Sequence, residues 1–379
     1  MNRLLPVLVL ASFAVGSLVW APAAGSETPR VLKVGPGRAL ETPSAAAALA
    51  RSGDTIEIDA ATYAGDTATW SQDDLTIRGV GGRPRLDAAG QNAQGKGIWV
   101  IAGDRTKVVN IEFTGASVPD GNGAGIRQEG TDLRIRRCVF HDNENGILAG
   151  ANAASDIRIS RSRFFRNGRG DGFTHNIYIG AVRSFTLTGS SVTTARVGHE
   201  VKSRALRNTI RANRILDKRA SASYSIDLPN GGDSVIAGNV IEQGPRSQNP
   251  AVISYGAEGL TNPSHRLWVV NNTLVNHRES GTYVALAAGT NAHLWNNLLV
   301  GPGDLVDRTA ERTTNRRVRS GFVDPSRYRF RLTQGSPAID RGTRPPARAR
   351  AAYEFRSPAD VTARPRVGRL DLGAFEFRT

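Results

Sequence analysis

The sequence predicts an all-β fold, a right-handed parallel β-helix of about ten coils with an N-terminal helical cap and a C-terminal capping coil. A short apolar pattern returns eight times, at intervals of 23 to 33 residues. Each repeat holds short β-branched strands separated by Gly, Asn, Asp and Ser turns, without the apolar stripe of an amphipathic helix. Intervals of about 25 residues suit three strands and three turns per coil and are too short for propeller blades. The repeats are marked by Val108, Ile135, Ile159, Leu187, Ile210, Ile236, Val269 and Leu294.

The first residues have the pattern of a secretory signal peptide, which we place at residues 1–24. Arg3 supplies the positive charge, residues 4–20 are apolar, and Ala21-Pro-Ala23 is a small-residue cleavage site. The alternative, an uncleaved membrane anchor, is disfavoured because the apolar run is short for a membrane span. We therefore expect a secreted or periplasmic protein with no membrane span after cleavage.

Residues 31–73 are expected to form the N-terminal cap of the β-helix. Residues 31–34 form a short strand, residues 44–50 are alanine-rich and helical, and residues 54–59 alternate as a strand. A helix at this point covers the open end of the coil stack, which otherwise exposes apolar core and unpaired strand edges.

The coils are expected over residues 74–302, and residues 303–379 are expected to form C-terminal coils, loops and a cap. Within the latter, residues 308–319 are rich in charge and are predicted to be exposed and mobile. Cys138 occupies a repeat position and is expected to be a small buried filler. Four asparagines share one coil position and favour a turn-stabilising ladder over a ligand site; they are Asn213, Asn239, Asn272 and Asn297.

Two segments resemble those of a known superfamily. The asparagine-rich coils and the ending SPAIDRG … GRLDLGAFEF resemble exported bacterial right-handed β-helix proteins of the pectate-lyase-like superfamily. The segment VGPGRALETPSAAAALARSGDTIEI is similar to the N-terminal cap of those proteins. The resemblance covers nearly the whole mature chain. It implies the fold more strongly than an activity, because the superfamily includes lyases, hydrolases, epimerases and proteins of unknown role.

The chain is strongly basic, with a formal net charge of +15. An exported basic protein suits an acidic polysaccharide, a cell surface or nucleic acid. Only five of the 49 Lys and Arg residues are lysines, which also fits a bias of genome composition. Aromatic residues do not alternate with the basic ones as stacking on bases requires, so we expect no nucleic-acid partner. We expect a monomer whose partner is an anionic polysaccharide.

A second strand in each coil carries the residues suited to chemistry. Its central apolar residue points into the core, so the neighbours on either side are expected to point outward. The central residues are Ile126, Ile147, Ile177, Val201, Ile226 and Ile253. The outward column that follows them is Arg127, Leu148, Tyr178, Lys202, Asp227 and Ser254.

Because adjacent coils lie about 4.8 Å apart, Tyr178, Lys202 and Asp227 are expected side by side. Asn176 and Glu200 precede the central residues and are expected to point outward beside them. Further residues of the predicted face are His175 and His199 at the turn edge, Arg204 further along the strand, and Asn230 in a glycine-rich turn.

This set of side chains indicates cleavage of a uronate polymer by β-elimination, which needs a base, an acid and a group that neutralises the carboxylate. Lys202 is the leading candidate for the base, and Tyr178 for the acid or, in a swapped scheme, the base. His175 and His199 compete for these catalytic roles. Arg127 and Arg204 are expected to hold the carboxylate. Asp227, Glu200, Asn176 and Asn230 are expected to contact the substrate.

Other functions remain open at this point. No cofactor is expected, with a calcium ion held by Glu200 and Asp227 as an alternative. A glycoside hydrolase would use the same two carboxylates as its catalytic pair. A uronate epimerase would use the Tyr, His and Lys side chains. A non-catalytic glycan-binding or cell-surface structural protein is the third class.

Overall fold

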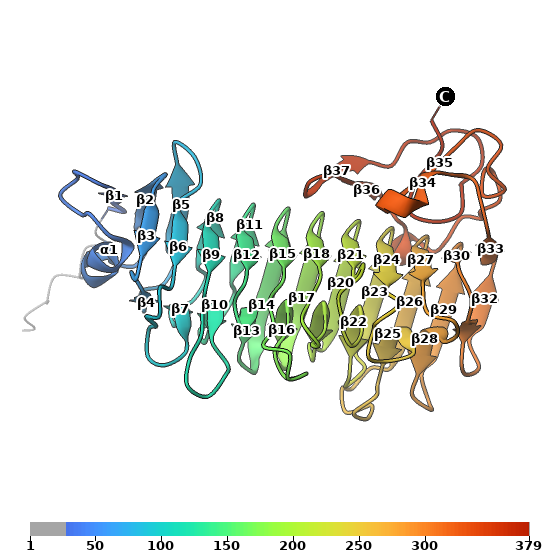
Figure 1. The fold of residues 1–379 in the computed structure, drawn as a ribbon, viewed down its shortest axis with the longest axis horizontal. Coiled ribbons are helices and arrows are strands. Elements are labelled where there is room, and N and C mark those ends of the chain that lie inside the picture. Colours follow the sequence, from blue (N-terminus) through green and yellow to red (C-terminus); the bar gives the residue numbers. More distant parts are fainter. Residues whose placement is uncertain (1–27, 379) are drawn as a thin grey trace, which may run out of the picture.

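The computed structural model describes residues 28–378, which form a long right-handed parallel β-helix (Figure 1). Each coil contributes one strand to each of three parallel sheets, here called sheets I, II and III. The predicted three strands per coil are thus confirmed. The predicted signal peptide, residues 1–24, lies outside the described residues.

The bounds of the sheet strands are as follows. Within residues 28–378, sheet I has 12 strands, in the order β1 (Val31–Val34), β2 (Thr55–Asp59), β5 (Thr76–Val80), β8 (Lys107–Val109), β11 (Arg134–Arg136), β14 (Asn152–Ser160), β17 (Val182–Thr188), β20 (Arg207–Arg211), β23 (Asp233–Ala237), β26 (Arg266–Val270), β29 (Asn291–Trp295) and β32 (Glu311–Thr313). In the same part of the chain sheet II has 10 strands, β4 (Ala68–Trp70), β7 (Gly97–Ile101), β10 (Ala124–Gln128), β13 (Asn145–Ala149), β16 (Ile177–Ile179), β19 (Val201–Ser203), β22 (Ile226–Leu228), β25 (Ala251–Tyr255), β28 (Thr282–Leu286) and β31 (Asp304–Val306). Sheet III has 11 strands among these residues, β3 (Thr62–Ala64), β6 (Arg85–Asp87), β9 (Glu112–Thr114), β12 (Val139–His141), β15 (Arg163–Phe165), β18 (Ser191–Thr193), β21 (Arg214–Leu216), β24 (Val240–Gln243), β27 (Thr273–Asn276), β30 (Leu298–Val300) and β33 (Arg316–Val318).

The N-terminal cap contains the predicted helix, α1 (Pro43–Leu49), at the β1 end of the stack (Figure 1). Thr42 caps its N-terminus by accepting a hydrogen bond from the Ala45 N–H, and Pro43 suits the first helical turn. The coil stack itself is longer than residues 74–302, because strands of all three sheets precede residue 74 and β33 follows residue 302. Residues 308–319 contain β32 and β33. Most of these residues are exposed, as predicted.

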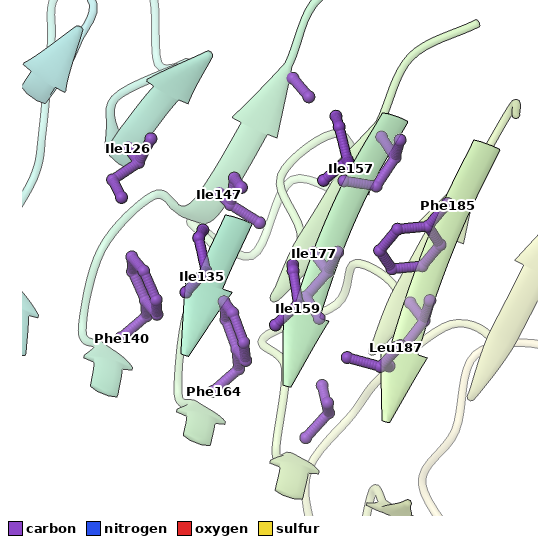
Figure 2. Packing of buried hydrophobic residues seen from close by; sticks show 14 of the residues in the cluster. Ile126, Ile135, Phe140, Ile147, Ile157, Ile159, Phe164, Ile177, Phe185 and Leu187 are labelled. Carbon is purple, nitrogen blue, oxygen red and sulfur yellow. The ribbon is translucent and has the colours of Figure 1, made fainter. Parts of the chain in front are cut away.

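The core is a set of vertical columns in which the same position of successive coils stacks. Ile126, Ile147 and Ile177 pair in register along sheet II and are fully buried. Phe140 and Phe164 stack in sheet III with ring centroids 4.6 Å apart (Figure 2). Because each column repeats at the spacing of the coils, a residue that points outward in one coil has its counterparts directly above and below it.

The predicted asparagine ladder is present at the corner between sheets I and III. The side-chain amide of Asn239 donates to the Asn272 side-chain oxygen at 2.9 Å and its own oxygen accepts from Asn213. The ladder continues through Asn297 to Asn315. Cys138 is fully buried, as predicted. Buried amides that satisfy one another and the turn backbone thus join the coils.

Replacing Asn239 by alanine is expected to lower the free energy of unfolding by about 2–4 kcal/mol. The Ile210 carbonyl and the Asn213 N–H then lose the partner that Asn239 provides and stay buried. Urea denaturation of the variant measures the effect. Asn291→Ala is the matched control, because that side chain is exposed at the start of β29 and should change stability by no more than about 0.5 kcal/mol. Equal stability of both variants would contradict a structural role for the ladder.

The segment after β33 folds back along the outer face of sheet III (Figure 1). It contains the antiparallel pairs β34 (Phe322–Asp324) with β35 (Arg329–Leu332) and β36 (Tyr353–Arg356) with β37 (Asp360–Ala363), and two short 3₁₀ helices, η1 (Pro325–Arg327) and η2 (Ala347–Ala349). Its apolar side chains cover four outward residues of sheet III, namely Leu216, Val240, Val275 and Leu298. None of the helices found between residues 28 and 378 has the length and apolar character needed to cross a membrane.

Candidate functional site

The candidate site lies on the outer surface of sheet II, where three coils place polar residues in register. Tyr178 pairs with Lys202, and Lys202 pairs with Asp227, on the adjacent strands β16, β19 and β22. The central residues Ile177 and Val201 are fully buried, so the side chains that follow them face outward. The prediction that Tyr178, Lys202 and Asp227 lie side by side on adjacent coils is therefore confirmed.

A cavity of about 490 Å³ opens beside this row. Tyr178, Lys202 and Arg204 form one side of it, together with His175 and Leu148. Two loops complete the wall and are formed by residues 120–122 and 171–173. Phe173 lies at this opening with 82% of its surface exposed. An exposed aromatic ring at the rim of a polar cavity provides an apolar face of the kind that packs against a ligand.

Arg204 is held at each of its three side-chain nitrogens. Nε donates to the Tyr178 hydroxyl at 3.0 Å, and one terminal nitrogen donates to the Asn230 side-chain oxygen at 2.7 Å. The other terminal nitrogen lies 2.7 Å from a carboxylate oxygen of Glu258. The predicted residues Arg204 and Asn230 are therefore part of the same cluster as Tyr178.

Glu258 is a member of the cluster that sequence reasoning missed. It lies in the loop of residues 256–265 that follows β25, and its carboxylate also accepts a hydrogen bond from Lys202 at 2.9 Å. A signal was present in the sequence, because the interval from Ile236 to Val269 is the longest between repeats. An interval longer than its neighbours indicates a loop inserted on one face of a solenoid.

His175 and His199 form a buried pair at the edge of the face. Their Nδ1 atoms lie 3.0 Å apart, and the His199 backbone N–H donates to Nδ1 of His175. Burial, together with the charges of Lys202 and Arg204, lowers the pKa of His199 to about 3 and that of His175 well below its usual value. Both rings are therefore neutral near neutral pH.

Asp227 lies beneath Lys202, with 3.6 Å between the carboxylate Oδ2 and Nζ. Burial raises the pKa of Asp227 to about 6, against the opposing charge of Lys202. Of the carboxylates beside Lys202, Asp227 is thus the one that changes charge close to neutral pH.

The prediction that Asn176 and Glu200 point outward is wrong. Strict alternation holds only within a strand, and both residues precede the first residue of their strands, β16 and β19. Their side chains turn inward and bond to each other, and Glu200 accepts a hydrogen bond from the Ala195 N–H at 2.9 Å. Burial and nearby carboxylates raise the pKa of Glu200 well above its usual value. Glu200 is therefore a buried structural residue that faces away from the candidate site.

Arg127 shares the outward column but lies apart from the cluster. Leu148 separates it from Tyr178, which places it two coils away, or about 10 Å. Its nearest described carboxylate belongs to Glu129, at 3.8 Å. The structure thus brings together Tyr178, Lys202, Arg204, Asn230 and Asp227, and leaves Arg127 outside the cavity.

Comparisons with known proteins agree with this fold. Residues 92–315, more than half of the chain, match the family model described as "Periplasmic copper-binding protein (NosD)". Among solved structures, pectate lyase Pel9A has a TM-score of 0.67 at 16% identity, covering 93% of this chain and 98% of its own. An alginate lyase from Paenibacillus sp. str. FPU-7 has a TM-score of 0.50 at 15% identity, covering 75% of this chain and 97% of its own. No curated protein matches the sequence.

The donor groups in the described part of the chain do not fit a copper site. Residues 28–378 contain no group of three or more His, Cys, Asp or Glu side chains placed to hold a metal ion. Copper favours thiolate, thioether and imidazole ligands. Burial raises the pKa of the Cys138 thiol to about 12, and the sole methionine is Met1, outside the described residues. The alternative of a calcium ion held by Glu200 and Asp227 also lacks support, because the Glu200 side chain faces inward.

Proposed function

The chain belongs to the NosD family, and we propose that it is a periplasmic polysaccharide lyase that cleaves a uronate-containing polysaccharide by β-elimination. The observation that carries the proposal is the cavity on sheet II, which places two cations and a phenol on one wall. The family description supports the periplasm, and the likeness to a pectate lyase and an alginate lyase supports a carbohydrate substrate. The predicted signal peptide fits the same location.

Binding of the substrate carboxylate is assigned to Arg204, assisted by Lys202. A guanidinium offers two parallel donors to a carboxylate, and Asn230 and Tyr178 hold Arg204 in place from other directions. Neutralising this carboxylate lets negative charge develop on the adjacent carbon when its proton leaves. Phe173 at the rim supplies the apolar surface for a sugar ring.

Lys202 is assigned as the base. Lys202 is a cation when the substrate carboxylate binds, and it first passes a proton to Asp227. The C–H bond beside the carboxylate then breaks and its proton passes to the amine that this transfer has freed. Asp227, whose Oδ2 lies 3.6 Å from Nζ, takes the proton that Lys202 gives up and releases it to solvent before the next turnover. A buried carboxylate with a pKa of about 6 is a better acceptor for this proton than an exposed one. An imidazole with a pKa of about 3 is a weak acceptor, which favours Lys202 over His199.

Tyr178 is assigned as the acid. Its oxygen accepts the hydrogen bond from Arg204, so its own O–H remains available to a ligand in the cavity. As the new carbon–carbon double bond forms, the bond to the glycosidic oxygen breaks and Tyr178 donates its proton to that oxygen. The phenolate then recovers a proton from solvent.

The positions of these groups favour elimination over the two other reactions. Tyr178 and Lys202 occupy adjacent coils of one wall, so they reach one face of a sugar, whereas an epimerase needs acid–base groups on both faces. A hydrolase needs two carboxylates across the sugar, and the Glu200 side chain of the expected pair is fully buried and bonded to Asn176 and the Ala195 N–H.

The test is a screen of the purified protein against alginate, pectate, glycosaminoglycans and bacterial exopolysaccharides, with and without a chelator. A lyase generates an unsaturated product that absorbs ultraviolet light, and a hydrolase generates new reducing ends without that absorbance. A glycan-binding protein retains polysaccharide and releases no product. Absence of the unsaturated product from every substrate would contradict the proposal.

The pH dependence of the activity provides a further prediction. We expect kcat/KM to fall as the pH is lowered through about 6, because protonated Asp227 no longer accepts the proton of Lys202. Asp227→Asn should remove this acidic limb and lower kcat by about 100-fold. Asp304→Asn, an exposed carboxylate on β31 of the same sheet, is the control and should keep the wild-type profile. An unchanged acidic limb in Asp227→Asn would exclude this role.

A further inference from the structure

The Glu258 carboxylate bridges the two cations of the cavity. One oxygen lies 2.9 Å from Nζ of Lys202, and the other lies 2.7 Å from a terminal nitrogen of Arg204. Glu258 thus accepts one hydrogen bond from each cation. The carboxylate of a bound uronate would accept hydrogen bonds from the same two cations. Hydrogen bonds from Lys202 and Arg204 outweigh the effect of partial burial and hold the pKa of Glu258 below its usual value, so it is charged at neutral pH.

The two cations do not depend on Glu258 for their position. Arg204 is also held by Tyr178 and Asn230, and Lys202 has the Asp227 carboxylate beneath it. Exposure of the side chains rises from 4% for Asp227 to 12% for Lys202, 25% for Arg204 and 45% for Glu258. Glu258 is therefore the most exposed member of the cluster.

The backbone around Glu258 is anchored, and its half-exposed side chain is held, among the described residues, only by Lys202 and Arg204. The Glu258 N–H donates to the Pro229 carbonyl at 3.0 Å, and Thr261 in the same loop accepts a hydrogen bond from the Asn230 side chain. Gly256 and Gly259 on either side adopt positive φ angles of 81° and 102°, which favour glycine. A rotation of the half-exposed side chain is thus enough to release both cations.

We propose that Glu258 is an internal stand-in for the substrate: its carboxylate occupies the anion-binding position of Lys202 and Arg204 until the carboxylate of a uronate residue displaces it. This inference rests on the proposed function, because it names the substrate group that the same cavity recognises. Each Arg204 nitrogen already has a partner, so a second carboxylate that takes two donors must replace one of them. Glu258 is the partner that leaves with least rearrangement.

Displacement of Glu258 makes binding selective for charged sugars. A neutral sugar that enters the cavity cannot replace the lost ion pairs, so the cations stay with Glu258. A uronate exchanges one carboxylate for another and keeps both cations paired. The cost is a lower apparent affinity, because the binding position is open only in the fraction of molecules in which Glu258 has turned away.

The test is calorimetric titration of Glu258→Gln with tetragalacturonate and tetramannuronate, in a Tyr178→Phe background that slows turnover under the proposed mechanism. Glutamine keeps the size of the side chain and removes its charge. We expect at least one of the two oligouronates to bind about tenfold more tightly than to Tyr178→Phe alone. Methyl-esterified tetragalacturonate, which lacks the charge, should gain nothing. Glu279→Gln is the matched control, an exposed glutamate on the turn of the next coil.

A weaker or unchanged affinity for both oligouronates in Glu258→Gln overturns the proposal, since Glu258 then supports the cations or is irrelevant to binding. A gain that includes the methyl ester also overturns it. Turnover is measured separately on a chain that keeps Tyr178, by the ultraviolet absorbance of unsaturated product. If the oligouronate binds more tightly but no unsaturated product forms, the lyase proposal is contradicted and the proposed role of Glu258 is supported. If product forms but the affinity does not rise, the lyase proposal is supported and the role of Glu258 is contradicted.

Discussion

Replacing Lys202 by arginine is expected to lower kcat by about 10²–10⁴-fold while KM changes little. Arginine keeps the positive charge beside Glu258 and Asp227, so binding of the substrate carboxylate persists. A guanidinium stays protonated, however, and cannot accept a proton from carbon. The measurement is steady-state kinetics on the polysaccharide found in the screen. Full activity of Lys202→Arg would show that Lys202 only binds the substrate.

Tyr178→Phe separates the acid from the base. The change removes the proton donor and one of the hydrogen bonds to Arg204, which keeps Asn230 and Glu258 as partners. We expect kcat to fall by about 10²–10⁴-fold without loss of the folded state. Tyr353→Phe is the control, because that ring is exposed on β36, in the segment that packs on sheet III. An unchanged kcat in Tyr178→Phe would exclude the phenol as the proton donor.

The alignment of the site residues on neighbouring coils could be predicted from the sequence, because it depends on two regular repeats. Side chains alternate along a strand, and coils repeat at one strand spacing, so aligning Ile177 with Val201 and Ile226 places Tyr178, Lys202 and Asp227 in a row. The asparagine ladder follows from the same repeat. These inferences need no knowledge of how any single side chain packs.

The residues that were missed or misplaced lie in turns and loops, where neither the alternation along a strand nor the coil repeat applies. Asn176 and Glu200 occupy a corner between sheets, where a turn directs both side chains inward. Glu258 comes from an inserted loop whose path no repeat specifies. The neutral state of His175 and His199 depends on burial by neighbouring coils, which becomes visible only in three dimensions. Strands and columns were therefore predictable, whereas corners, loops and charge states were not.

Buried carboxyl groups determine how stability depends on pH. Glu242 on β24 is fully buried; one of its oxygens accepts the Lys218 N–H at 2.7 Å and the other has no hydrogen-bond partner among the described residues. Burial and the neighbouring Asp217 raise the pKa of Glu242 to about 8, and burial raises that of Asp217 to about 6. Glu200 adds to the same cluster, and its pKa is also raised. Near neutral pH the folded chain therefore holds protons that the unfolded chain has released.

These carboxyl groups contribute stability that is fully present below about pH 4.5 and is lost as the pH rises toward 8. Below the unfolded pKa of about 4.5, Glu242 is protonated in both states and the full stability is present. Above it the unfolded chain ionises first, so each rise in pH favours unfolding until the folded pKa is passed. Other groups oppose this trend on the acid side. The buried His175 and His199 stay neutral in the folded chain, so protonation of the unfolded chain below about pH 6.5 favours unfolding. Asp142 and Asp156, whose pKa values are lowered to about 2, do the same below about pH 4.

Glu242→Gln tests this dependence directly, because glutamine can still accept the Lys218 N–H and carries no charge at any pH. We expect the variant to match the wild type at pH 4.5 and to exceed its free energy of unfolding at pH 8 by about 2–4 kcal/mol. Urea denaturation at the two pH values measures the difference, and Glu279→Gln, which alters an exposed carboxylate, should reproduce the wild-type decline. A Glu242→Gln variant that is no more stable than the wild type at pH 8 would mean that Glu242 ionises at little cost in the folded chain.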